Sequence, residues 1–123
     1  MDPWLLSAAA LSLFTAGVHL FAGGAAVARP LLASRELDPV VKYTAYYCWH
    51  LVSLVLVAMP IGFGVGAVRE ESRELAVLMT ALAAAFGLLS VWLVVWTRLG
   101  KWRLPQWALF VPIALLGAVG LWR

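Results

Sequence analysis

Charge is scarce in this chain. Only 12% of its 123 residues are Asp, Glu, Lys or Arg, whereas 64% are hydrophobic. A soluble globular domain carries about twice that share of charged residues. The residues between the apolar stretches are too few to build a water-soluble domain. We therefore expect a single membrane domain over residues 1–123.

Several residue patterns that carry chemistry are also missing. Cys48 is the only cysteine, so no disulfide can form within the chain. Every Asp and Glu lies outside the long apolar stretches. No Ser-His-Asp, Cys-His-Asp or phosphate-cradling arrangement is present. These absences argue against an autonomous enzyme. The net charge of +3 comes from basic residues at the ends of the apolar stretches rather than from a basic run, so nucleic acid is not an expected partner.

What the chain does contain is a series of apolar stretches that are long enough to cross a bilayer. A spanning helix needs roughly 20 mostly apolar residues, because each residue rises about 1.5 Å and the hydrocarbon core is about 30 Å thick. The expected helices cover residues 4–28, 43–67, 75–97 and 104–122. Short connections make consecutive helices antiparallel neighbours. The sequence predicts an all-α integral membrane protein of four transmembrane helices in an up-down antiparallel bundle.

The basic residues divide unequally between the two sides of this predicted bundle. The connections at residues 29–42 and 98–103 share one side and hold most of the Lys and Arg. The other side holds fewer basic residues, with Glu70, Glu71 and Glu74 beside them. By the positive-inside rule, the two basic connections face the cytoplasm and both termini face outward. We expect a multi-pass protein of the bacterial inner (plasma) membrane.

Small residues indicate where the helices make close contact, because lipid removes the hydrophobic drive for helix association. Gly62 and Gly66 form a G-x-x-x-G pair. A stripe of small residues also recurs at three- and four-residue spacing in the third stretch: Thr80, Ala83, Ala84, Gly87 and Ser90. Such faces predict packing within the chain, self-association or contact with other membrane subunits, in a lipid bilayer that covers the rest.

The two histidines, His19 and His50, each lie inside an apolar stretch. By the predicted helix limits they sit roughly 13 and 10 Å from the same interface, so their imidazoles are expected at nearly the same depth. Each belongs to a polar stripe, and such stripes turn away from lipid. The stripe of the first helix is Ser12, Thr15, His19 and Gly23, and that of the second is Tyr43, Tyr46, Tyr47, His50 and Ser53.

Ligation of a b-type haem is one use for this pair. Two imidazoles from different helices suffice as axial ligands of six-coordinate iron. Arg29, Lys42 or Arg98, on the same side, would then meet the propionates. A quinone-linked redox site is a related hypothesis. In these hypotheses His19 and His50 are the cofactor-binding or metal-ligating residues.

Other uses stay open on the residues alone. A bare metal site is weaker, since zinc needs three or four ligands. Proton handling in a small transporter or channel would use His19, His50 and Tyr46 or Tyr47, because imidazole titrates near neutral pH. The structural alternative is that each histidine only bonds a hydroxyl or a backbone carbonyl of a neighbouring helix. The expected function is therefore a binding or accessory subunit of a membrane complex, centred on His19 and His50 and supported by Tyr46 and Tyr47.

Overall fold

The computed structural model describes residues 1–123 and is helical throughout, without strands. This confirms the all-α expectation. The elements in chain order are α1 (Pro3–Gly17), a π-helical segment η1 (Val18–Ala28), α2 (Arg29–Ala33), α3 (Pro39–Val68), a short 3₁₀ turn η2 (Glu70–Ser72), α4 (Arg73–Thr97) and α5 (Trp107–Trp122). The first three follow one another without a break, so they form one long helical segment.

Three helical segments are long and apolar enough to cross a membrane: Pro3–Ala33, Pro39–Val68 and Glu70–Thr97. The apolar helix α5 has 16 residues, about 24 Å of helix, and is shorter than the predicted stretch 104–122. The difference lies at its start. Pro105 has no backbone N–H and disfavours a helical conformation at Leu104, so residues 101–106 form turns and the helix begins at Trp107.

Two aspartates explain where the first and second long helices begin. Asp2 and Asp38 each precede a proline, and each carboxylate accepts hydrogen bonds from backbone N–H groups of the first turn that follows. Asp is a favoured N-cap residue and Pro suits the first helical position. The second helix therefore begins at Pro39, earlier than the predicted residue 43. Because α2 also prolongs the first helix, the expected connection 29–42 shrinks to residues 34–38.

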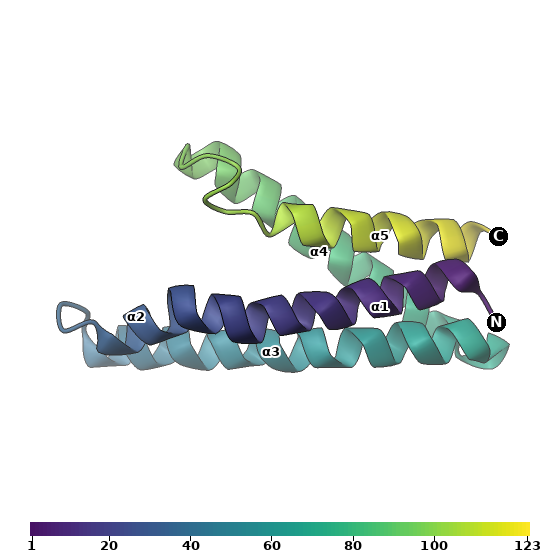
Figure 1. Cartoon of the computed structure of the whole chain (residues 1–123), viewed down its shortest axis with the longest axis horizontal. Coiled ribbons are helices and arrows are strands. Elements are labelled where there is room, and N and C mark those ends of the chain that lie inside the picture. Colours follow the sequence, from purple (N-terminus) through teal and green to yellow (C-terminus); the bar gives the residue numbers. More distant parts are fainter.

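The helices pack as two pairs that meet at one end of the molecule (Figure 1). α1 packs against α3, and α4 packs against α5. At the end that holds both termini, α1 also contacts α5 and α3 also contacts α4. Toward the opposite end the two pairs diverge, and the α1–α3 pair continues alone through η1 and α2 (Figure 1). Both chain ends lie together at the end where the two pairs meet (Figure 1).

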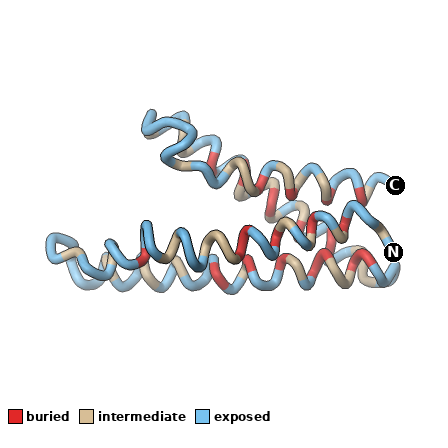
Figure 2. Tube along the Cα trace, viewed as in Figure 1, coloured by how far each residue is buried: buried red, intermediate tan, exposed pale blue.

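The buried residues gather where the two pairs meet (Figure 2). The largest fully buried apolar side chains there are Leu5, Leu56, Met59, Phe63 and Ile113, and these come from α1, α3 and α5. Small residues of α4, such as Ala76 and Ala83, complete the same core. This core ends where the two pairs diverge. In the part of the α1–α3 pair that carries the histidines, the two helical segments therefore pack only against each other.

The expected small-residue contacts are confirmed. Gly62 and Gly66 face α4, and a methyl group added at Gly66 would lie 2.8 Å from the Cβ of Ala76. In the predicted stripe of α4, Gly87 faces Val111 of α5. The glycines of the G-x-x-x-G pair thus allow α3 and α4 to approach closely next to the turn that joins them.

Candidate functional site

Both histidines lie on the α1–α3 pair, in the region where the second pair has diverged. His19 is near the start of η1, and His50 is in α3. The side chain of His19 contacts Trp49 and Ser53 of α3. Because these two residues bracket His50 in the sequence, His19 and His50 lie within about one helical turn of the same level. The predicted alignment in depth is therefore present.

His19 is held tightly by its neighbours. Its Nε2 atom lies 3.0 Å from Ser53 Oγ, and its ring stacks on Trp49 with the centroids 3.9 Å apart and the planes 18° from parallel. Ser53 Oγ in turn donates a hydrogen bond to the Trp49 carbonyl oxygen at 3.1 Å. Nε2 of His19 and the backbone of Trp49 thus share the Ser53 hydroxyl as a hydrogen-bond partner. His19 joins the two helices.

Trp49 is the residue of this arrangement that sequence reasoning missed, because it belongs to neither of the two polar stripes. Its ring reaches across to η1 at Gly23, where a methyl group would lie 2.7 Å from Trp49 Cη2. Gly23 is thus required for the close approach of the indole. One signal in the sequence was available: Trp49 and Ser53 are four residues apart and so share a helix face.

His50 has a different environment. It is exposed, its ring meets Tyr46 edge-on with the centroids 4.6 Å apart, and neither ring nitrogen forms a hydrogen bond within the chain. Tyr46, Trp49 and His50 form one wall of a cavity of about 260 Å³ between α3 and the η1–α2 segment. No hydrogen bond and no ring stacking joins His50 to His19, so the two imidazoles make no direct contact.

The opposite wall of this cavity is built from two straight columns of η1 and α2 side chains. Leu20, Gly24, Ala28 and Leu32 form one column, and Phe21, Ala25 and Arg29 form the other. The members of each column are four residues apart. Residues four apart lie on one face of a helix. The π-helical segment therefore keeps small residues along the floor of the cavity.

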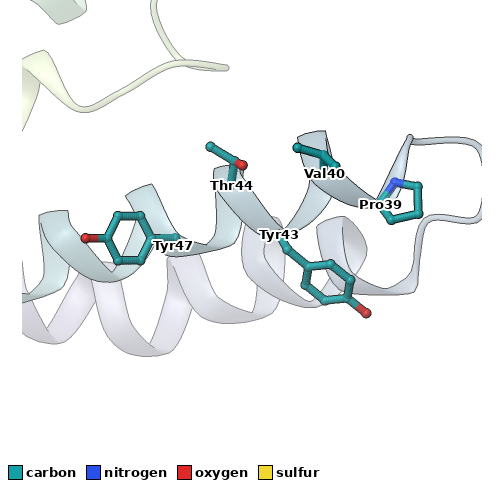
Figure 3. Close-up of a pocket in the computed structure, with 5 residues that line it drawn as sticks. All are labelled: Pro39, Val40, Tyr43, Thr44 and Tyr47. Atoms are coloured by element: carbon teal, nitrogen blue, oxygen red, sulfur yellow. The ribbon is translucent and has the colours of Figure 1, made fainter.

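Tyr47, which was expected to support the histidines, faces elsewhere. It lies with Tyr43 and Thr44 along another face of α3, in a hollow that is lined only by residues from the start of that helix (Figure 3). The rings of Tyr43 and Tyr47 point in different directions from this face (Figure 3). Of the two tyrosines named from the sequence, only Tyr46 meets a histidine.

The arrangement does not fit a haem held between the two histidines. Nε2 of His19 is hydrogen-bonded to Ser53 Oγ, whereas an axial ligand needs a ring nitrogen that is free to bind iron. His50 faces the cavity on its own. No group of three or more His, Cys, Asp or Glu side chains is placed to hold a metal ion. What the site offers is an imidazole, a phenol and the guanidinium of Arg29 around an otherwise apolar hollow.

Comparison with known proteins adds no assignment. No protein-family model matches the chain, and no characterised protein and no solved structure is significantly similar to it.

Proposed function

We propose that this protein is a multi-pass protein of the bacterial inner membrane that acts as a small binding or accessory subunit. Its four long helices would cross the bilayer as an up-down antiparallel bundle, with the connections 29–42 and 98–103 in the cytoplasm. Two observations support a membrane environment. Three helical segments have the length and hydropathy of membrane spans. Large apolar side chains such as Leu54, Ile61 and Leu88 are more than half exposed along the helices, and soluble monomers rarely expose wide apolar surfaces.

The observation that carries the binding function is the cavity beside His50. Three polar side chains line it, those of Arg29, Tyr46 and His50, and none of them has a hydrogen-bond or ion-pair partner in the chain. Polar groups away from water are costly unless something pairs with them. A molecule seated in the cavity would supply that partner. The site has donors and apolar walls but no carboxylate, so it suits binding better than acid-base catalysis.

The two histidines thus have separate roles in this proposal. His19 stabilises the contact between η1 and α3 through Ser53 and Trp49, and His50 faces the bound molecule. Haem ligation, quinone-linked redox chemistry and proton-coupled transport stay predictions, since no contact in the structure favours any of them. Haem ligation by the pair would require His19 to leave Ser53.

Native mass spectrometry of the protein, extracted from bacterial membranes in a mild detergent, tests the binding function. We expect a retained small-molecule adduct on the natural chain and its loss in Gly24→Leu. A Cβ at Gly24 meets no atom within 4 Å, so leucine would fill the cavity without disturbing the helices.

Gly64→Leu is the matched control, because a Cβ at Gly64 also meets nothing within 4 Å and this residue does not line the cavity. The adduct should survive in Gly64→Leu. A chain that carries no adduct, or an adduct that Gly24→Leu leaves in place, would contradict the proposal.

A further inference from the structure

We infer that the cavity between η1, α2 and α3 binds the phosphate headgroup of an anionic phospholipid, with Arg29, Tyr46 and His50 as its donors. This inference rests on the proposed function and names the class of molecule that the cavity accepts. The three donors come from two neighbouring helical segments and meet at one hollow. Each can donate a hydrogen bond to an anionic oxygen, and the guanidinium can do so with two parallel N–H groups.

The charge around the cavity favours an anion. No Asp or Glu is among the residues that line it. Arg29 forms no ion pair. The one salt bridge of this structure joins Arg73 and Glu70, which lie beside the residues of both chain ends. The site therefore presents one uncompensated guanidinium beside an imidazole and a phenol.

Two of the other charged groups at this end of the α1–α3 pair are already engaged, whereas Arg35 and Glu36, in the connection between α2 and α3, form no ion pair. Lys42 Nζ donates to the carbonyl oxygens of Leu32 and Ser34, at the end of α2. The Asp38 carboxylate accepts from the first backbone N–H groups of α3. The Asp38 carboxylate is therefore committed to the start of α3, and no carboxylate of the chain forms an ion pair with Arg29. An external anion would supply that partner.

The shape of the site favours a lipid over a soluble phosphate compound. The cavity of about 260 Å³ equals roughly nine water volumes, enough for a phosphate and a glycerol unit. Its walls are apolar apart from the three donors, with Leu20, Phe21 and Leu32 at its rim. In the proposed topology Arg29 lies at the cytoplasmic interface, where basic pockets between membrane helices commonly bind anionic headgroups. The acyl chains would remain in the bilayer beside the exposed Phe21.

Lipid titrations followed by native mass spectrometry test this inference. The purified protein, in detergent, is titrated with phosphatidylglycerol and with phosphatidylcholine of the same acyl chains. We expect one phosphatidylglycerol to bind about tenfold more tightly than phosphatidylcholine, because only the former carries a net negative charge to pair with Arg29. Arg29→Gln should remove most of this preference, and Arg29→Lys should keep part of it. His50→Phe should weaken the binding of both lipids, because both carry the phosphate to which His50 donates.

Arg98→Gln is the matched control, since Arg98 is a basic residue of the other connection and does not line the cavity. It should keep the full preference. Thermal unfolding of each variant confirms that the fold is intact. Equal binding of the two lipids, or a preference that persists in Arg29→Gln, would overturn the inference.

Glycerol 3-phosphate, added without lipid, distinguishes the two sources of the phosphate. Weak or no competition with phosphatidylglycerol supports the lipid, whereas binding as tight as that of the lipid would overturn the lipid assignment. The failure of the proposed function would be a different result, namely that no molecule of any class needs the cavity for its binding. An adduct that needs the cavity but is not a phospholipid contradicts only this inference.

Discussion

His19 and His50 are chemically identical and lie at one level of the same helix pair, yet their surroundings are opposite. His19 has its ring covered by Trp49 and its Nε2 atom bonded to Ser53. His50 has only the edge of Tyr46 and an open cavity. The difference arises from which helix face each occupies. At the residue scale, His19 is a packing residue and His50 is the one available to a ligand.

The bond between His19 and Ser53 should contribute measurably to stability. Ser53→Ala removes the hydroxyl that is hydrogen-bonded to His19 Nε2, so we expect it to lower the free energy of unfolding by about 0.6 to 2 kcal/mol. Ser12→Ala is the control, because Ser12 Oγ is buried without any hydrogen bond and its loss should cost nothing. Unfolding in mixed micelles by titration with sodium dodecyl sulfate measures both. Equal effects of the two substitutions would refute the assignment of His19 as a packing residue.

The elements differ in what their glycines do. In η1, Gly23 admits the Trp49 ring, whereas Gly24 borders open space. In α3, Gly66 touches the backbone of α4, whereas Gly64 touches nothing. Arg73, at the start of α4, donates to the Gly120 carbonyl oxygen near the end of α5 at 2.6 Å. These contacts fasten the ends of three helices where the two pairs meet.

A methyl group at Gly66 should therefore weaken the α3–α4 contact. Gly66→Ala places a Cβ 2.8 Å from Ala76 Cβ and 3.2 Å from the Ala76 backbone nitrogen, and such overpacking costs about 1 to 3 kcal/mol. Gly64→Ala meets no neighbour and should leave stability unchanged or raise it by up to about 1 kcal/mol, because alanine favours the helix. Thermal unfolding followed by circular dichroism compares the two. If Gly66→Ala unfolds no earlier than Gly64→Ala, the close approach of α3 and α4 is not needed for the fold.

At the scale of the whole molecule, two helix pairs share a core at one end and separate toward the other (Figure 1). The connection between α4 and α5 and the connection between α2 and α3 lie away from the chain ends (Figure 1). Because the number of long helices is even, both termini lie at the same end of the molecule. If the helices cross a bilayer as proposed, η2 and the α4–α5 connection lie on opposite sides of it.

Single cysteines test this arrangement in a Cys48→Ser background. With a membrane-impermeant maleimide on intact cells, Glu71→Cys in η2 should react at once. Arg98→Cys, at the end of α4, should react only after the membrane is permeabilised, because the positive-inside rule places its connection in the cytoplasm. Glu36→Cys, in the connection before α3, should behave like Arg98→Cys. Labelling of residues 71 and 98 from the same side would show that α4 does not cross.

The helices themselves could be predicted from the sequence, since hydropathy and length are properties of each segment on its own. The limits differed where Asp and Pro act locally: Asp38 and Pro39 start α3 earlier than predicted, and Pro105 makes α5 start later than predicted. The G-x-x-x-G contact of Gly62 and Gly66 was also predictable, because only small residues permit close approach in lipid. The shared depth of His19 and His50 followed from counting residues along antiparallel helices.

Which side chains meet was decided only by the tertiary structure. Neighbouring residues point about 100° apart around a helix. The rotation of α3 about its own axis therefore determines whether Trp49, His50 or Tyr47 faces η1. Packing on Gly23 sets that rotation: it brings Trp49 onto His19, leaves His50 at the cavity and turns Tyr47 away. The π-helical turns of η1 could not be predicted from a hydropathy pattern either. Sequence alone determined an apolar, all-helical chain with two histidines at one level. Only packing separated the histidine that holds the helices together from the one that faces the cavity.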